Sequence, residues 1–271
     1  MASSQLTEFR ERGAILLEGL FSPDEIERVR ADAKQVFAAQ LRRHGLLQSG
    51  DASEAAFEAA LFELFARHFD DFVNCGKQIQ HLVSLHRLSL DARIMAVLED
   101  FGIRFPNINT RPVLYFNHPR LAKAEVYWRV FPHQDWRSMQ GSLDGVVIWV
   151  PLADTDVALG AIEVAPGSHK LGLMTKEVVG GFGQVDGFTD DDFVAIEVKQ
   201  GDALIFSAFL VHRSGTNVTD SIRWSCHFRY NNLAEETFIE RGYPHSFVYK
   251  PTEELITPDF PTPEQLGEVF G

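Results

Sequence analysis

His133 and Asp135 stand two residues apart in the segment Pro132-His133-Gln134-Asp135-Trp136, and both side chains can bind a metal ion. Alternate side chains of a β-strand face the same side, so a strand here would present the imidazole and the carboxylate together. One nitrogen and one oxygen ligand suit a divalent first-row metal. By itself, such a pair is more often a hydrogen-bonded polar patch than a metal site. A metal site therefore requires a third ligand elsewhere in the chain.

A third ligand is found downstream, at the end of an apolar run. Residues 201–212 read as a turn followed by an apolar strand that ends on His212. Two histidines and one carboxylate form a set that leaves coordination positions open, as non-haem Fe(II) oxygenases require for a cosubstrate and O2. On the next predicted strand, Arg223 can bind a carboxylate through a bidentate fork. We therefore expect a metal site with a carboxylate anchor beside it.

The elements that must position these residues change character near residue 110. Residues 1–110 read as mostly helical, with expected helices over 26–41, 55–72 and 80–101 and one short strand within 13–20. Ser22, Pro23 and Glu25 form a helix start, with Ser22 as the N-cap and Glu25 three residues later. We expect these helices to buttress a β-rich second half.

The second half consists of short segments rich in β-branched and aromatic residues, separated by Gly, Pro and Asp turns. Such strands indicate a sandwich or a barrel, so the expected class is mainly β with α. We expect a single domain over 1–271, with the β core in 111–250. The expected strands are 111–116, 124–131, 145–152, 162–165, 194–198, 203–206 and 222–230.

Composition excludes several functions. The net charge is −13 and the pI about 5.2, which disfavours a nucleic-acid partner. The sequence has no run of eighteen apolar residues, so we expect no membrane partner. Cys75 and Cys226 are too few for a disulfide framework, which favours a cytoplasmic location. The expected partner is a small-molecule substrate, and the sequence does not predict the oligomeric state.

Several stretches together resemble the phytanoyl-CoA dioxygenase family of Fe(II)/2-oxoglutarate-dependent oxygenases. The resemblance spans most of the chain, and its motifs are jointly specific although each is short. It is carried by residues 13–25, 133–135, 149–152 and 160–169, by the spacing His212-x-Ser214-Gly215-x-Asn217-x-Thr219, and by Arg223 eleven residues after His212.

The resemblance implies a double-stranded β-helix core, the cupin-like jelly roll, that binds Fe(II), 2-oxoglutarate and O2. It also implies a role for each matching residue. His133, Asp135 and His212 would bind iron, while Arg223 and Ser214 would hold the distal carboxylate of 2-oxoglutarate. Gln134 and Trp149 would line the cosubstrate pocket, and either Tyr115 or Tyr127 would supply a further cosubstrate contact.

The resemblance further implies hydroxylation of an unactivated C–H bond, with release of succinate and CO2. Related halogenases have Ala or Gly where this chain keeps Asp135, which favours hydroxylation, although desaturation and cyclisation remain open. Arginines near the predicted site favour an anionic metabolite or a saccharide as substrate. Strand parity and proximity to the ligands give four candidate substrate residues: Arg129, Arg137, His227 and Arg229.

Two other interpretations remain. The chain could be a cupin-like metal protein without oxidative chemistry, such as an isomerase or a binding domain, but such a protein has no need of the Arg223 and Ser214 anchor. A family member that has lost turnover is disfavoured by the complete ligand set. We expect His169 to be structural and residues 172–192 to form a lid.

Overall fold

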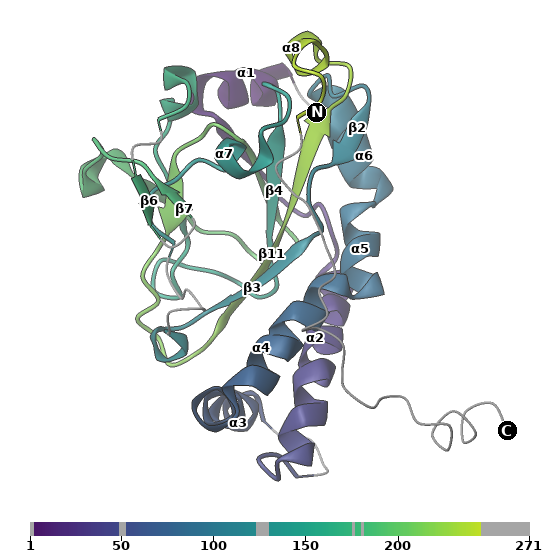
Figure 1. Ribbon diagram of the computed structural model, residues 1–271, viewed down its shortest axis with the longest axis vertical. Coiled ribbons are helices and arrows are strands. Elements are labelled where there is room, and N and C mark those ends of the chain that lie inside the picture. The colour runs from purple at the N-terminus through teal and green to yellow at the C-terminus, as the bar shows by residue number, and fades with distance from the viewer. Residues whose placement is uncertain (1–2, 49–52, 123–129, 175–176, 180–181, 245–271) are drawn as a thin grey trace, which may run out of the picture.

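The computed structural model describes residues 3–48, 53–122, 130–174, 177–179 and 182–244 (Figure 1). Within them, no helix is long and apolar enough to cross a membrane. The helices are α1 (Ser3–Arg12), α2 (Pro23–Arg43), α3 (Glu54–Arg67), α4 (Phe69–Gln78), α5 (Val83–Ser89), α6 (Ala92–Asp100), α7 (Trp136–Met139) and α8 (Glu236–Glu240), with 3-10 turns η1 (Ile79–His81), η2 (Pro119–Leu121), η3 (Ser168–Leu171) and η4 (Asp190–Asp192). The strands are β1 (Ala14–Leu17), β2 (Pro106–Ile108), β3 (Val113–Asn117), β4 (Val146–Pro151), β5 (Ile162–Val164), β6 (Glu177–Val179), β7 (Phe182–Gln184), β8 (Val194–Ile196), β9 (Ala203–Ser207), β10 (His212–Ser214) and β11 (Arg223–Asn232).

These strands form two main antiparallel sheets that enclose a cavity. The larger sheet has the order β1-β9-β4-β11-β2, with β3 also paired to β11. The smaller sheet has the order β10-β5-β8, and β6 pairs with β7 as a separate ribbon. Side chains from both main sheets line the same cavity. The mainly β architecture with a jelly-roll core is therefore confirmed, and β1 extends the larger sheet from within the helical part of the chain.

Strand β11 contributes side chains both to the main core and to the cavity. Its even-numbered residues, Trp224, Cys226, Phe228 and Tyr230, are buried in the main core together with helical side chains. Its odd-numbered residues from Arg223 to Arg229 line the cavity between the sheets. Alternation along a strand produces this division, because successive side chains point to opposite faces.

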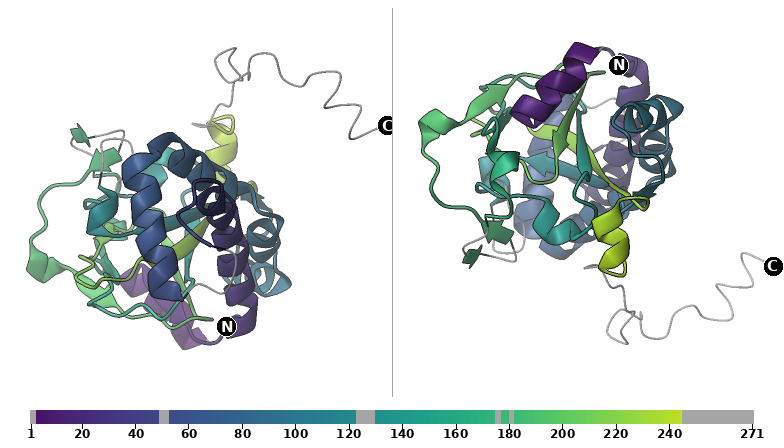
Figure 2. Two further views of the ribbon diagram at one scale, coloured as in Figure 1. Left: turned by 90° about the horizontal axis from the view of Figure 1, so that it is seen from below. Right: turned by 90° about the horizontal axis from the view of Figure 1, so that it is seen from above.

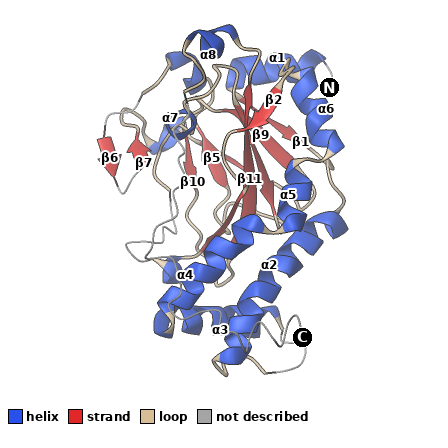
Figure 3. Cartoon of the chain, turned by 45° about the vertical axis from the view of Figure 1, so that its right-hand side comes forward, coloured by secondary structure: helices blue, strands red, loops and turns tan. Residues whose placement is uncertain are grey.

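Helices α2 to α6 gather on the outer face of the larger sheet, as the views in Figure 2 and the colouring in Figure 3 show. Phe37 of α2 packs in this layer against Phe72, Phe116 and Trp224, with ring centroids 5.5, 5.7 and 6.1 Å away. Aromatic contacts of this kind stabilise beyond the area they bury. Many of the phenylalanines thus belong to the core cluster that these helices share with the sheet.

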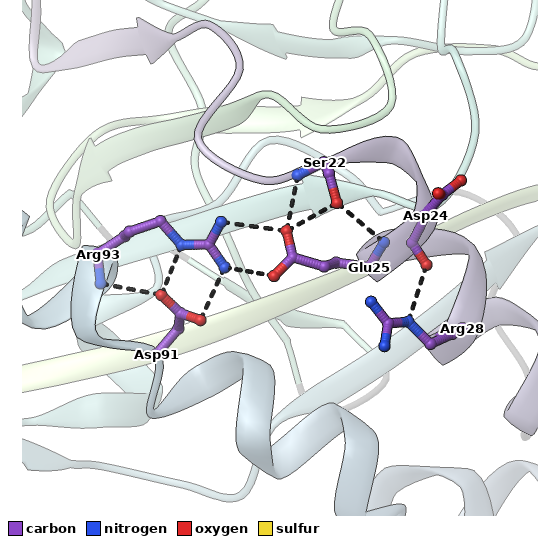
Figure 4. A network of polar contacts seen from close by, with 6 residues as sticks. All are labelled: Ser22, Asp24, Glu25, Arg28, Asp91 and Arg93. Carbon is purple, nitrogen blue, oxygen red and sulfur yellow. Dashed lines mark hydrogen bonds and ion pairs between the residues drawn. The ribbon is translucent and has the colours of Figure 1, made fainter.

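The predicted start of α2 is confirmed and also joins α2 to α6 (Figure 4). Ser22 and Glu25 form the reciprocal capping box. Arg93 of α6 donates to both carboxylate oxygens of Glu25, over 3.1 and 2.7 Å, and also binds Asp91, the N-cap of α6. The Arg93 hydrogen bond, followed by the contacts with Ser22, lowers the pKa of Glu25 to about 2.

The helical part differs from expectation in its breaks. The expected helix over 55–72 is interrupted at His68, whose backbone leaves the helical region and separates α3 from α4. The expected helix over 80–101 is divided into η1, α5 and α6, with Asp91 starting a new helix through its side chain. Helix α1 was not expected from the sequence, and most of the expected strand 124–131 lies outside the described residues.

Candidate active site

The segment around His133 is not the regular strand expected from the sequence. His133 makes an isolated bridge to His212, in which each backbone N–H donates to the other residue's carbonyl over 3.0 and 3.1 Å. Asp135 has helical backbone angles and is the N-cap of the short helix α7. The two side chains therefore converge because the chain turns into a helix after the bridge, and not because of strand parity.

His133, Asp135 and His212 form the metal-competent group found among the described residues. One donor atom from each lies within 4.8 Å of the others. The Nδ1 atoms of His133 and His212 lie 2.8 and 2.9 Å from the backbone carbonyls of Phe131 and Leu210. A carbonyl accepts hydrogen bonds, so Nδ1–H must be the donor in both rings. Each Nε2 is then left with a lone pair that can bind a metal, and the three residues proposed from the sequence lie together.

Burial and neighbouring charge prepare these side chains to bind a cation. Burial, together with the neighbouring His133, lowers the pKa of His212 to about 3, and burial lowers the pKa of His133. Burial alone would raise the pKa of Asp135, but Arg229 and the two histidines outweigh it and lower that pKa. The site thus holds two neutral imidazoles and a carboxylate, the protonation states that a divalent metal requires.

A cavity of about 390 Å³ opens beside this group, between the two sheets. Its lining includes Trp149 from β4, Tyr115 from β3 and Ser214 from β10. Four side chains of β11 also face it, which confirms the shared facing predicted for this strand: Arg223, Ser225, His227 and Arg229.

Arg223 carries a buried charge that faces the cavity. The residue is 3% exposed, and its Nη1 donates to the carbonyl of Gly160. Its Nε and the neighbouring Ser225 Oγ are buried without a hydrogen-bond partner among the described residues. Burial lowers the pKa of Arg223 to about 10, which still leaves it charged at neutral pH. Because unpaired buried donors are costly, this end of the cavity fits a carboxylate ligand.

Not every predicted contact residue reaches the cavity. Gln134 donates to the carbonyls of Gly172 and Phe209 and accepts from the Met174 backbone N–H, so its amide fastens a loop and is absent from the lining. Arg137 is likewise absent from the lining. Tyr127 and Arg129, expected to contact the cosubstrate and the substrate, lie outside the described residues. Of the two tyrosines left open, Tyr115 is placed beside Arg223 and lines the cavity.

Arg229 makes a contact that sequence reasoning missed. Its Nη2 lies 3.0 Å from Oδ1 of Asp135, across 94 residues of sequence. Arg213 lines the cavity too, but it forms ion pairs with Glu163 and with Asp190. Thr110 and Arg111 come from the loop between β2 and β3, where no motif marked them.

Comparison with known proteins decides the family. The family model described as phytanoyl-CoA dioxygenase (PhyH) matches residues 9–225. The chain belongs to the phytanoyl-CoA dioxygenase family. It is therefore an enzyme of the Fe(II)/2-oxoglutarate-dependent dioxygenase class, as its sequence motifs implied.

This phytanoyl-CoA dioxygenase family member has curated relatives of low sequence identity, some of which align over nearly the whole chain. Phytanoyl-CoA dioxygenase domain-containing protein 1 of Bos taurus is 25% identical, over 95% of this chain and 98% of that protein. The 1-deoxypentalenic acid 11-beta-hydroxylase of Streptomyces exfoliatus is 33% identical, but over only 32% of this chain and 34% of that enzyme.

Solved structures support the fold. The epimerase SnoN, crystallised with Fe3+, alpha ketoglutarate and nogalamycin RO, has a TM-score of 0.59 at 19% identity, covering 84% of this chain and 82% of that one. EctD from S. alaskensis, with 2-oxoglutarate and 5-hydroxyectoine, has a TM-score of 0.53 at 20% identity, covering 87% and 77%. At these identities the likeness concerns the jelly-roll fold.

Proposed function

We propose that this protein is a dioxygenase that hydroxylates an unactivated C–H bond of a small metabolite or saccharide, with 2-oxoglutarate converted to succinate and CO2. The observation that carries the proposal is the pairing of two features in one cavity. One is the cluster of His133, Asp135 and His212, and the other is the buried guanidinium of Arg223, whose Nε has no hydrogen-bond partner among the described residues.

In this proposal His133 and His212 bind Fe(II) through Nε2, and Asp135 binds it through its carboxylate. The carbonyls of Phe131 and Leu210 fix the ring orientations, since each accepts the Nδ1 proton. This pattern is typical of metal-binding histidines, whose other nitrogen is held by an outer partner. Three protein ligands leave coordination positions for a cosubstrate and O2.

Arg223 and Ser214 hold the distal carboxylate of 2-oxoglutarate, and Ser225 and Tyr115 lie on the same part of the lining. Iron, 2-oxoglutarate and O2 supply the oxidising chemistry when bound, while the protein supplies binding and orientation. Apolar lining excludes water from the reacting centre, which protects a reactive site from side reactions. In the described part of the chain it consists of Val113, Val130, Val147, Trp149, Ile162 and Phe206.

A non-oxidative cupin, such as an isomerase, is the second candidate function. A non-oxidative cupin has no need of a buried arginine with an unpaired Nε in the same cavity as the metal cluster, whereas a dicarboxylate cosubstrate requires such an anchor. Outcomes other than hydroxylation start from the same cofactors, and one solved structure similar to this chain is described as an epimerase. Incorporation of isotopically labelled O2 into the product distinguishes hydroxylation from these outcomes.

The test is an anaerobic titration of the Fe(II)-loaded protein with 2-oxoglutarate, followed by the weak visible charge-transfer band. We expect the band in wild type and in Arg137→Gln, an arginine outside the cavity. In Arg223→Gln the dissociation constant for 2-oxoglutarate should rise by roughly 30-fold or more, as expected when a buried charged partner is removed. Bound iron without any band in wild type would exclude the oxygenase function.

A further inference from the structure

Arginine dominates the charge of the cavity. Among the described residues, its lining contains four arginines, Arg111, Arg213, Arg223 and Arg229, and one acidic residue, Asp135. Arg213 is already neutralised by Glu163 and Asp190. In the proposed function, Arg223 is neutralised by the cosubstrate.

Arg229 is in a different position, because its partner is a proposed metal ligand. Its side chain is 15% exposed and binds Oδ1 of Asp135 at 3.0 Å. A divalent metal on the Asp135 carboxylate would take up that negative charge, which leaves the guanidinium without a full counter-charge. The Nε of Arg229 is buried and has no hydrogen-bond partner among the described residues. A buried, uncompensated charge is unfavourable, so metal loading favours a second anion beside Arg229.

His227 extends the same feature toward Arg223. It stands two residues before Arg229 on the cavity face of β11, and its Nε2 is buried without a partner in the described part of the chain. Burial, and then the adjacent Arg229, lowers the pKa of His227 well below its ordinary value. The imidazole is therefore neutral and offers one hydrogen bond to a ligand, while Arg229 supplies the charge.

Arg229 and Arg223 lie at opposite ends of the cavity-facing part of β11. They are six positions apart in the sequence, which corresponds to about 20 Å along an extended strand. The two arginines therefore cannot bind the same small carboxylate, and Arg229 lies at the end next to Asp135. One end of the strand suits the cosubstrate, and the other suits a second ligand.

We propose that Arg229 and His227 form the subsite for an oxyanion group of the substrate, so that the substrate is a small organic carboxylate, phosphate or sulfate oxidised close to that group. This inference rests on the proposed function. The cavity is at the small end of ligand pockets and must hold the cosubstrate too, so the part of the substrate that enters is small. The charge balance favours an anion over a neutral saccharide.

The experiment uses the anaerobic protein loaded with Fe(II) and saturated with 2-oxoglutarate. Acetate, benzoate and methylphosphonate are titrated in, with acetamide and benzamide as uncharged counterparts, and the charge-transfer band is followed. We expect at least one oxyanion to shift the band saturably without bleaching it, and the amides to have no effect. The member of the panel that binds best distinguishes carboxylate from phosphate recognition.

Three variants identify the residues responsible. In Arg229→Gln we expect the dissociation constant of the active oxyanion to rise about tenfold or more. Arg229→Lys keeps the charge but loses the fork, so it should give an intermediate value and remains informative if the glutamine variant is unstable. Arg137→Gln, the matched control outside the cavity, should bind as wild type does.

Several results would overturn this inference alone: a band insensitive to every oxyanion, amides that bind as well as carboxylates, or unchanged oxyanion affinity in Arg229→Gln. Bleaching of the band would mean that the oxyanion displaces 2-oxoglutarate at Arg223, and would also overturn it. Absence of any band in wild type is a different result, because it overturns the proposed function itself.

Discussion

At the scale of single residues, Asp135 combines three contacts in a buried position. It begins α7, faces both histidines and accepts a hydrogen bond from Arg229. An isolated carboxylate in such a buried place would be unfavourable, and Arg229 offsets that cost in the absence of a metal. The residue can therefore remain ionised and ready for a cation.

Loss of one histidine should abolish tight metal binding. In His212→Gln the imidazole nitrogen that faces His133 and Asp135 is removed, and we expect affinity for Co(II) or Fe(II) to fall by at least about 100-fold. Isothermal titration calorimetry measures this affinity, with circular dichroism to verify folding. His81→Gln is the control, because His81 is exposed and stands outside the cluster. Equal affinity in both variants would remove His212 from the proposed ligands.

The Gln134 side-chain amide holds the loop after η3 against the residues that follow β9. In Gln134→Ala, the Gly172 and Phe209 carbonyls and the Met174 N–H lose their partner. We expect a loss of about 2–3 kcal/mol in the free energy of unfolding, and faster tryptic cleavage after Lys170. Gln35→Ala, at an exposed position of α2, should change neither quantity. Normal resistance of Gln134→Ala to trypsin would show that the loop is held by other contacts.

At the scale of elements, the Arg93 network is the clearest link between two helices (Figure 4). Its removal in Arg93→Met should lower the free energy of unfolding by about 1 kcal/mol at pH 7. The pKa of Glu25 is about 2 in the folded protein against an ordinary value of 4.5. The stabilisation is therefore complete above about pH 4.5 and is lost as the pH falls toward 2.

Urea denaturation at pH 7 and pH 3.5 measures this effect. The difference between wild type and Arg93→Met should be smaller at the lower pH. Arg28→Met is a suitable control, because Arg28 bonds only to the backbone carbonyl of Asp24 within the network drawn in Figure 4. A pH-independent difference would mean that Arg93 acts through its packing over the Phe21 ring, 4.8 Å away.

Much of the architecture could be predicted from the sequence because local rules decide it. The cap at Ser22 and the alternation along β11 follow from residue type and period, and both are confirmed. The turn of Asp135 into α7 could not be read from the segment around it, because the neighbouring aromatic residues Phe131 and Trp136 also suit a strand. The contact between Arg229 and Asp135 was equally hidden, since it joins positions 94 residues apart. Pairings of that kind depend on how sheets and loops close in space.

At the scale of the whole molecule, the helical layer is coupled to the strand that carries the cavity residues. Glu58 of α3 is buried and accepts the backbone N–H of Ile222 over 2.9 Å, directly before Arg223. Burial raises the pKa of this carboxyl group, only partly offset by the Ile222 hydrogen bond. The folded protein thus binds a proton here more readily than the unfolded chain does.

Glu58→Gln should therefore slightly stabilise the protein at neutral pH. The amide oxygen keeps the hydrogen bond to Ile222 and carries no charge to bury. The pKa of Glu58 is raised in the folded protein, so wild type is most stable below the ordinary value of 4.5 and loses stability as the pH rises. The difference in stability between Glu58→Gln and wild type should therefore shrink at low pH. In Glu58→Ala the Ile222 N–H is left unpaired, at a cost of about 1–3 kcal/mol. Thermal unfolding at pH 7 and pH 4 compares the three proteins, and a destabilised Glu58→Gln at pH 7 would contradict this account.

The two-sided character of β11 has a consequence for how such an enzyme can diversify. Substitutions at its odd-numbered positions alter what the cavity accepts while the helix-facing side remains packed, so new specificities can arise without loss of the scaffold. Insertion or deletion of one residue has the opposite result, because it exchanges the two faces along the rest of the strand. Arginines would then point into the aromatic layer and Trp224 or Phe228 into the cavity. Along this strand, the cavity can therefore change by substitution of single residues but not by a one-residue change in length.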